Sequence, residues 1–346
     1  MKVGILYNFV DEISKGKDID KIADNEVVET ANAIMSALSM YGHSAELVRV
    51  NNTDLDRCIS SLKKNYDLVF NIAEGIDGDN LAESIIARKL YDNRIVFTGS
   101  DHIALSTCVD KVRTKELLIK NRIPTPRYAI FNCAESVDRI ASLKFPMIVK
   151  PVHEDGSIGI TSDSVVRTKE ELKRKVTEII DIYEQPALVE EYIDGREINA
   201  AIIGNGNDIE VLPLSEITFT DFPEGVPKIV SFEAKWIEDS EQYIKTSGKC
   251  PADIEPEITE KIRMLAKKAF QLTGCRDYAR VDFRIRDGKP FVIEVNPNPC
   301  INPNGAGFIR SANTAGYSYD DIINKIMSTA IDRNSLMKEL KVEIRK

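Results

Sequence analysis

The sequence predicts a mixed α/β and α+β protein of three domains: a Rossmann-like N-terminal domain followed by two α+β domains. Two observations lead to this prediction. Short apolar segments alternate with helix-length amphipathic segments over about the first hundred residues. After Gly99 the order changes to strand pairs, hairpin turns and separate helices. A chain of 346 residues is long enough for two or three domains with cores of their own.

The domain boundaries are placed where the order of elements changes. We assign residues 1–102 to the N-terminal domain, 103–188 to the central α+β domain and 189–332 to the C-terminal α+β domain. The last segment, 333–346, reads RNSLMKELKVEIRK and is expected to be a charged, solvated helical tail.

The N-terminal domain is expected to alternate strands and helices. The strands are predicted at 2–8, 44–50, 66–75 and 94–100, and the helices at 24–41, 54–64 and 80–91. The first strand, KVGILYN, is a short apolar run typical of a buried parallel strand. The helix at 24–41 carries apolar residues at helical spacing and stops at Gly42, a residue suited to a C-cap.

The rest of the chain is expected to form two α+β units. Helices are predicted at 107–123, 169–183 and 256–273, the last with Pro256 in its first turn and Gly274 as its cap. Segment 145–162 is predicted as strand, polar loop and strand. Segment 186–205 is predicted as two strands around Asp194–Gly195.

The composition argues against several classes of protein. A net charge of −9 argues against a large nucleic-acid surface, which needs clustered cations. Six cysteines without a C-x-x-C pair, and only three histidines, argue against a Cys/His zinc site and favour a reducing cytosol. The N-terminus meets acids early, unlike a signal peptide, and no apolar run approaches eighteen residues. We therefore expect a cytoplasmic protein with neither a nucleic-acid nor a membrane partner.

Three side chains with oxygen ligands lie on a predicted hairpin over 279–296. Asp282 is on the first strand, and Glu294 and Asn296 share one face of the second. A two-residue Asp–Gly turn would pair Asp282 with Ile293, and Asp282 and Glu294 would then point to opposite faces. Both can hold one metal ion only if the turn has an odd length or the pair contains a β-bulge. Such an oxygen set suits Mg²⁺ or Mn²⁺, and the alternative is the solvated outer face of a hairpin.

Three lysines are candidates for binding a phosphate near such a metal. Lys150 ends the apolar strand FPMIVK, and the loop 153–160, HEDGSIGI, could cover a phosphate with its N–H groups. This loop is not a Walker loop. Lys111 and Lys235 are the other two candidates, although a lysine at such positions is more often a solvated surface residue.

Together these segments resemble the ATP-grasp superfamily and, more narrowly, the D-alanine–D-alanine ligase family, from residue 1 to about 330. The matching stretches are FNIAEGIDGD, TGSD…DKVRTK, IVKPVHEDGSIGI, LVEEYIDGREINAAIIGN, VLPLSEI, FEAKW and GCRDYARVDFR…FVIEVNPNP. Each piece alone is a modest signal, but their order and spacing are specific. The resemblance implies a three-domain fold in which the two α+β domains clasp ATP.

The resemblance also implies a role for each matching residue. It assigns the phosphates to Lys111, Lys150 and the backbone of Ser157, and the adenine hinge to Glu190, Glu191 and Ile193. It assigns the ribose to Glu197, the loop that closes over ATP to Lys235, and the metal ligands to Asp282, Glu294 and Asn296. Arg280 would stabilise the oxyanion of the tetrahedral intermediate. The implied cofactors are ATP and two Mg²⁺ (or Mn²⁺) ions.

The implied activity is ATP-dependent amide or peptide bond formation through an acyl phosphate, with release of ADP and phosphate. A carboxylate would attack the γ-phosphoryl group, and an amine would then attack the acyl phosphate. Arg280 and backbone N–H groups would hold the oxygen that becomes negative, while closed loops exclude water. The implied partners are small-molecule carboxylate and amine substrates and a second copy of the chain in a homodimer.

The departures from the family pattern fall on the amino-acid pocket. LYNFVDEIS lacks the family's first-strand glycines and offers only Glu12 as a late acid. Glycine replaces the first serine of the Gly–Ser–Ser loop, tryptophan replaces the tyrosine after EAK, and cysteine replaces a glycine in NPNPCINP. No serine follows that cysteine to hold a second carboxylate. The candidate substrate residues are Glu12, Glu74, Gly156, Trp236, Cys300 and Gly305.

These departures predict a substrate other than D-alanine, with a larger or less polar carboxylate or amine. Replacing a Tyr–Ser–Glu set by Trp236 and Gly156 would leave a small zwitterion with unpaired buried charges, which is costly. One alternative is an authentic D-alanine–D-alanine ligase with a rearranged pocket. Another is a non-catalytic ATP-binding sensor, against which the intact metal set and Arg280 stand. Cys300 reads as a structural cysteine in a tight loop rather than a nucleophile.

Overall fold

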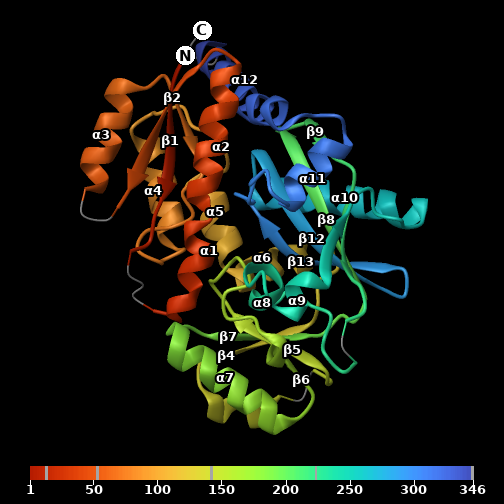
Figure 1. Ribbon diagram of the computed structural model, residues 1–346. Helices are drawn as coiled ribbons and strands as arrows, with labels where there is room; N and C mark the ends of the chain where they lie inside the picture. The colour runs from red at the N-terminus through yellow and green to blue at the C-terminus, as the bar shows by residue number, and fades with distance from the viewer. Residues whose placement is uncertain (12–14, 52–53, 141–142, 223, 344–346) are drawn as a thin grey trace.

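The computed structural model describes residues 1–11, 15–51, 54–140, 143–222 and 224–343. Within these residues the strands form three sheets, and the sheets with their covering helices lie side by side (Figure 1). The mixed α/β and α+β fold class predicted from the sequence is confirmed.

The N-terminal sheet is parallel, with the order β2-β1-β3. Its strands are β1 (Lys2–Asn8), β2 (Ser44–Val50) and β3 (Leu68–Asn71). The helices of this part are α1 (Lys21–Asn25), α2 (Val27–Met40), α3 (Leu55–Asn65) and α4 (Ala82–Asp92). The predicted strand at 94–100 is wrong, because in this segment only Phe97 pairs, in a single bridge to Val69.

The central sheet is antiparallel, with the order β4-β7-β5-β6, and α7 covers it at one end of the molecule (Figure 1). Its elements are β4 (Tyr128–Phe131), β5 (Met147–Pro151), β6 (Val165–Val166), α7 (Lys169–Tyr183) and β7 (Ala187–Glu191). The second strand predicted within 145–162 is wrong, because that segment ends in turns and β6 begins only at Val165.

The C-terminal sheet has the order β11-β10-β8-β12-β13, with β9 paired to β8. Its strands are β8 (Arg196–Asn205), β9 (Asp208–Val211), β10 (Ser215–Phe219), β11 (Thr246–Lys249), β12 (Asp277–Arg286) and β13 (Lys289–Asn296). Its helices are α8 (Phe232–Trp236), α9 (Glu241–Ile244), α10 (Pro256–Thr273), α11 (Gly307–Thr314) and α12 (Tyr319–Glu343). Pro256 lies in the first turn of α10 and Gly274 caps it with φ 77°, as predicted.

The single helix predicted over 107–123 is wrong. The chain forms α5 (His102–Val109) and α6 (Lys111–Lys120) instead, and the two meet at Asp110. The Asp110 carboxylate accepts a hydrogen bond from Arg113 N at 3.0 Å and so caps a new helix. As a result Lys111 lies in the first turn of α6.

The N-terminal and C-terminal sheets share one hydrophobic core. Ile5 from β1, Ile34 from α2, Ile203 from β8 and Ile323 from α12 all belong to it, and all are at most 1% exposed. Helix α12 packs on α2, so the last helix of the chain lies against the N-terminal domain (Figure 1). The predicted domain boundaries stay a prediction. Strand β7 (Ala187–Glu191) spans the boundary that was expected between residues 188 and 189.

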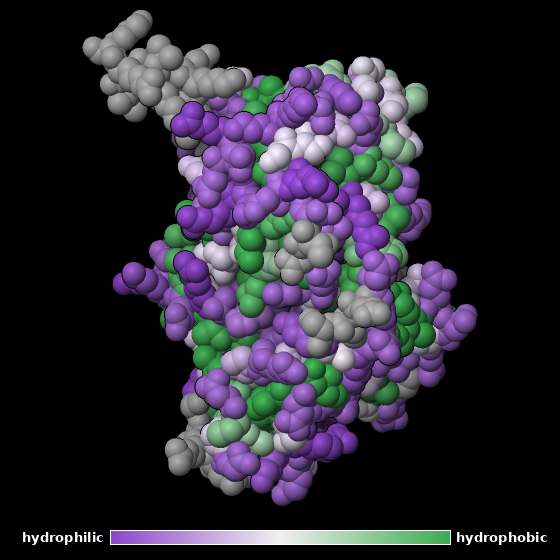
Figure 2. Space-filling view, turned by 90° about the vertical axis from the view of Figure 1, so that its left-hand side faces the viewer, coloured by the Kyte–Doolittle hydropathy of each residue, from purple (hydrophilic) through white to green (hydrophobic). Residues whose placement is uncertain are grey.

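The face that carries α3 and α4 is mostly hydrophilic, with separate hydrophobic groups between the polar residues (Figure 2). None of the helices in the described part of the chain combines the length and the apolar character that a membrane crossing requires.

Candidate active site

A β-bulge places Asp282 and Glu294 on the same face of the β12–β13 hairpin. The turn is a two-residue Asp287–Gly288 turn with positive φ at both positions, 50° and 69°. Such a turn alone would pair Asp282 with Ile293. The register instead shifts just after Asp282, which pairs with Glu294 and leaves Ile293 as the extra residue. Of the two conditions derived from the sequence, the bulge is the one that holds.

Asp282 is the centre of a polar cluster on this face. Arg280 forms a two-point ion pair with it, with both N···O distances 2.7 Å. Asn199 Nδ2 donates to Oδ1 at 2.8 Å, and Asn296 Nδ2 donates to Oδ2 at 2.9 Å. Because Asn296 donates through its nitrogen, its Oδ1 is the atom that can face a cation.

Glu294 is ionised and lies beside Lys111. Its Oε1 is 2.9 Å from Lys111 Nζ, which also donates to Asp155 Oδ1 at 3.2 Å. Burial raises the pKa of Glu294, but Lys111, Lys150 and Arg280 outweigh burial and lower it to about 2.

The donor set fits a hard divalent cation. The described residues hold no group of three His, Cys, Asp or Glu side chains that could bind a metal by themselves, so an amide oxygen has to complete the set. Asp282, Glu294 and Asn296 supply carboxylate and amide oxygens from neighbouring positions of one hairpin. Mg²⁺ commonly binds through one or two carboxylates and completes its shell with water and phosphate oxygens.

Two lysines from different elements converge on the buried Glu190. Lys150 Nζ lies 2.7 Å from Glu190 Oε2, and Lys115 pairs with the other carboxylate oxygen. Lys115 also donates to Thr125 Oγ1 at 2.7 Å. Burial and the nearby Lys150 lower the pKa of Lys115 to about 8, against the opposing effect of Glu190. Sequence reasoning missed Lys115, although its i,i+4 spacing puts it on the same helix face as Lys111.

The predicted hinge residues are held by two arginines that the sequence did not single out. Arg284 is 5% exposed. It pairs with Glu197 at 2.7 Å and donates to the carbonyl of Ile193 at 3.2 Å. Arg286 pairs with Glu191 at 2.8 Å. Both arginines come from β12, so the strand that carries Asp282 also orients the hinge after β7.

The loop after β5, which contacts Lys111 through Asp155, also contacts the segment 230–236. Gly156 and Ser157 take positive φ values, 62° and 66°. Trp236 Nε1 donates to the carbonyl of Gly156 at 2.7 Å, and Ser157 Oγ donates to the carbonyl of Val230 at 2.7 Å. Lys235 Nζ lies 4.4 Å from the centre of the Trp236 ring, a cation–π contact.

Comparison with known proteins identifies the family of the chain. Residues 117–328 match the family model "D-ala D-ala ligase C-terminus". The chain belongs to the D-alanine–D-alanine ligase family. Membership makes it an ATP-grasp protein and an ATP-dependent ligase that forms C–N bonds.

Individual relatives extend the likeness over most of the chain. The ligase is 33% identical to a D-alanine–D-alanine ligase of Carboxydothermus hydrogenoformans, over 88% of this chain and 93% of the relative. It is 37% identical to the uncharacterized protein y4sG of Sinorhizobium fredii, over 87% of both chains. A crystal structure of the D-alanine–D-alanine ligase of Bacillus anthracis complexed with ATP superimposes with a TM-score of 0.74. It is 20% identical, and the match covers 97% of this chain and 99% of that one.

The candidate amino-acid pocket of the ligase contains acids and a thiol. Cys300 donates to Glu26 at 3.2 Å, and both line a small hollow together with Glu74. Burial raises the pKa of the Cys300 thiol well above its usual range, with Glu26 adding to the shift. A protonated thiol is a poor nucleophile, in agreement with a structural role. Glu12 lies outside the described residues.

The loop that follows Cys300 is tied to two different elements. Glu29 on α2 accepts from Asn302 Nδ2 at 3.1 Å and from Asn304 Nδ2 at 2.7 Å. The carbonyl of Gly305 accepts from Arg310 on α11 at 3.0 Å. Sequence reasoning missed Glu26, Glu29 and Arg310. No local motif marks the two glutamates, whose partners are more than 250 positions away, or Arg310, whose side-chain partner Ser215 lies on β10.

Proposed function

We propose that this ligase joins a small carboxylate to an amine through an acyl phosphate, with release of ADP and phosphate, and that its substrate pair differs from two D-alanines. The observation that supports the reaction is one continuous cluster of charges. Asp282 and Glu294 lie on one face of the hairpin, with Arg280 at 2.7 Å from the first and Lys111 at 2.9 Å from the second.

The residues divide into three tasks in this proposal. Lys111 and Lys150 are the cations for the ATP phosphates, Ser157 covers the phosphates with its backbone, and Lys235 closes from the loop above them. Glu190, Glu191, Ile193 and Glu197 form the pocket for adenine and ribose. Arg284 is a positioning residue for that pocket, since it holds both Glu197 and the Ile193 carbonyl.

Mg²⁺ or Mn²⁺ would be held by Asp282, Glu294 and Asn296, where a pair of such ions supplies charge neutralisation for the phosphate oxygens. Arg280 is positioned by its two-point pair with Asp282 and lies beside these acids. In this position its guanidinium can stabilise the negative oxygen that forms when the amine attacks. The Trp236–Gly156 hydrogen bond holds two loops together and keeps water from the acyl phosphate.

The pocket chemistry supports a substrate other than D-alanine. Residue 156 is a glycine, so it has no side-chain hydroxyl to offer a substrate. Its backbone carbonyl already accepts a hydrogen bond from Trp236. Glu26 and Glu74 line the hollow beside Cys300, which favours a substrate with a cationic group at this end.

ADP release in the presence of Mg²⁺, ATP and a matrix of carboxylates and amines tests the proposal. Amine-dependent ADP formation with a new amide product, identified by mass spectrometry, supports it. Accumulation of D-alanyl-D-alanine with saturable dependence on D-alanine would overturn the substrate part and favour an authentic D-alanine–D-alanine ligase. ATP binding without turnover over the whole matrix would favour a sensor.

We also propose a homodimer and a cytoplasmic location. Leu81 before α4, Ile85 on α4 and Ile103 on α5 are 42%, 50% and 58% exposed, and a second copy could cover these separate hydrophobic groups. The six cysteines are free thiols, as in a reducing compartment. Light scattering after size exclusion measures the oligomeric state, and fractionation of cells measures the location.

A further inference from the structure

Arg310 on α11 has no carboxylate partner among the described residues, although the nearby arginines of the site do. Its Nε donates to Ser215 Oγ at 2.7 Å and its Nη1 to the Gly305 carbonyl at 3.0 Å. Arg280 and Arg284 each pair with an acid at 2.7 Å. A guanidinium keeps its charge at any physiological pH, so Arg310 brings an unbalanced positive charge into the site.

The guanidinium of Arg310 lies in space left by Gly248 and borders Gly307. A Cβ on Gly248 of β11 would lie 1.9 Å from the guanidinium, so only glycine leaves room for the group against this strand. A Cβ on Gly307 would lie 3.5 Å from Arg310 Nη2 and 3.0 Å from Asn199 Oδ1. Asn199 in turn donates to Asp282. The remaining nitrogen of Arg310 therefore points toward the Asn199 side of the metal-binding cluster.

Burial makes the positive charge of Arg310 costly. Burial is the main reason that the pKa of the Arg310 guanidinium is lowered; Cys250 opposes this shift and the charge of Arg280 adds to it. Arg280 already has Asp282 as its counter-ion, so Arg310 is the one of these two cations that needs a further anion. The lysines assigned to the phosphates reach the site from β5 and α6, whereas Arg310 reaches it from α11, over β10 and β11. A second anionic group, distinct from the phosphates, would balance this charge.

We propose that Arg310 binds an acidic side-chain group of the amine substrate, which makes this enzyme a ligase for an amino dicarboxylic acid. The inference rests on the proposed ligase function and narrows its substrate class. Arg280 is the residue proposed for the oxyanion, and Arg310 adds a fork of donors whose geometry suits a carboxylate. Neutral amino acids of similar size leave the Arg310 charge without a partner.

Equilibrium binding tests this inference independently of turnover. Trp236 is the only tryptophan of the chain and lies in the loop contact above the site, so its fluorescence reports ligand binding. The probes are the D- and L-forms of aspartate, glutamate and alanine, each titrated with Mg²⁺ and a non-hydrolysable ATP analogue. We expect one acidic probe to bind roughly tenfold or more tightly than alanine, and Arg310→Gln to abolish this preference.

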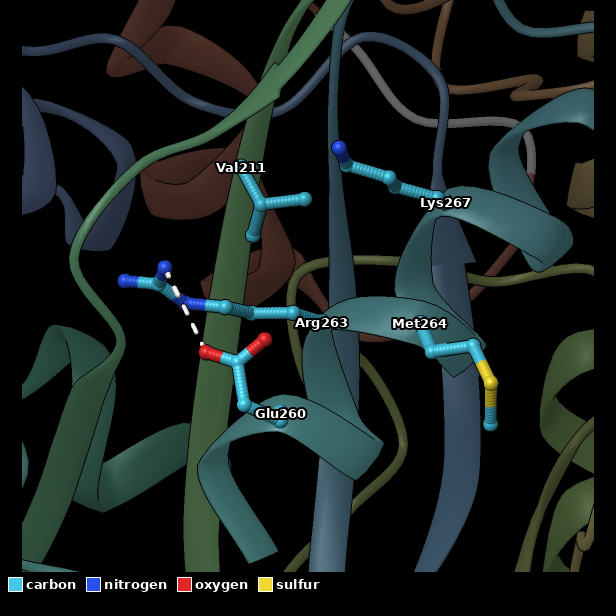
Figure 3. Close-up of a pocket in the computed structure, with 5 residues that line it drawn as sticks. All are labelled: Val211, Glu260, Arg263, Met264 and Lys267. Carbon is cyan, nitrogen blue, oxygen red and sulfur yellow. Dashed lines mark ion pairs between the residues drawn. The ribbon is translucent and has the colours of Figure 1, made fainter. Parts of the chain in front are cut away.

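Three variants separate recognition from a structural role. Arg310→Lys keeps the charge and should keep part of the preference. Gly248→Ala would put a Cβ 1.9 Å from the guanidinium, so it should displace the group and reduce acidic binding even if Arg310→Gln folds poorly. Arg263→Gln is the control. Arg263 pairs with Glu260 and lines a hollow of about 320 Å³ on α10 (Figure 3), and its replacement should leave all affinities unchanged.

The inference would be overturned if Arg310→Gln lost the same affinity for acidic and for neutral probes. It would also be overturned if the unmodified protein showed no preference for acidic probes. The proposed ligase function would stand in that case if amine-dependent ADP release is observed. An Arg310-dependent preference without ADP release from any substrate pair would retain the binding site and overturn the ligase proposal.

Discussion

The indole nitrogen of Trp236 and the backbone carbonyl of Gly156 are joined by a hydrogen bond of 2.7 Å. This bond links the loop after β5 to α8, two segments that come from different sheets. Gly156 has φ 62°, and a Cβ at this position would meet the Trp236 ring at 3.8 Å. The hydrogen bond between the loops therefore depends more on the Trp236 donor than on the absence of a side chain at position 156. It is a loop contact made by one indole and the backbone, where the family pattern uses two hydroxyl side chains.

Replacing Trp236 by phenylalanine should loosen this loop contact. The ring and most of its packing are kept, but the bond of about 1 kcal/mol to the Gly156 carbonyl is lost. We expect the KM for ATP to rise about fivefold with little change in the melting temperature. Steady-state ADP release measures the first, and differential scanning fluorimetry the second. An unchanged KM in this variant would show that the bond does not hold the closed loops.

Replacing Asp277 by alanine should destabilise the whole fold. Asp277 is 0% exposed and pairs with Arg333 of α12 at 2.9 Å. It also accepts from Gly99 N and from Asn205 Nδ2, both at 2.9 Å, so it joins three parts of the chain. Loss of a buried partner of this kind costs about 3–5 kcal/mol. Chemical denaturation gives the value.

The matched control for Asp277 is Asp92→Asn. Asp92 pairs with Arg88 at 3.4 Å on the surface of α4, where both side chains are more than half exposed. Exposed i,i+4 pairs contribute about 0.3–0.5 kcal/mol, so the free energy of unfolding should change by no more than this. Similar losses in the two variants would mean that the Asp277 cluster carries no special share of the stability.

Because of the titration of Lys115, the free energy of unfolding should increase as the pH is raised from 8 to 10.5. Its pKa falls from 10.5 to about 8 on folding, mainly because of burial. Over this range the unfolded chain holds a proton that the folded chain has released, so stability increases with pH by up to on the order of 3 kcal/mol. In Lys115→Met this part of the slope should vanish.

The measurement is the free energy of unfolding of the parent chain and of Lys115→Met at intervals of pH. Lys120→Met is the control, because Lys120 is exposed at the end of the same helix. It should follow the parent curve. Parallel curves for the parent chain and Lys115→Met would contradict the assignment of the shift to Lys115.

Local sequence pattern was enough for most elements and for the functional strand pair. The helix 169–183 was predicted from its periodicity with its observed bounds, and Pro256 and Gly274 marked both ends of another. The helix across Asp110 failed because a side-chain cap competes with continuous periodicity. The strand at 94–100 failed because apolar, β-branched composition cannot show whether a second strand is available to pair.

The candidate site was predictable only where its residues share a motif. The metal-binding candidates of the hairpin lie within fifteen positions, so the sequence alone requires either a turn of odd length or a bulge, and the structure has the bulge. Arg310 and Lys115 carry no such motif. Their significance comes from what surrounds them: the absence of a nearby acid for Arg310 among the described residues, and a shared carboxylate for Lys115. These are properties of packing between distant segments.

Replacing Asp282 by asparagine should impair catalysis without unfolding the hairpin. The change removes the carboxylate that pairs with Arg280 through two 2.7 Å contacts and that is proposed to hold the metal. The amide keeps the shape but loses the charge that orients the guanidinium. We expect kcat/KM to fall by about two to three orders of magnitude, and the Mg²⁺ concentration for half-maximal rate to rise.

Asp287→Asn is the matched control, because Asp287 is exposed in the turn of the same hairpin and asparagine tolerates its φ of 50°. It should leave both values unchanged. Chelation of divalent ions should stop ADP release in the parent chain, and added Mg²⁺ should restore it. If Asp282→Asn keeps the parent Mg²⁺ dependence while kcat falls, the carboxylate acts through Arg280 alone. The metal ligands would then have to be sought among Glu294, Asn296 and other oxygens of the site.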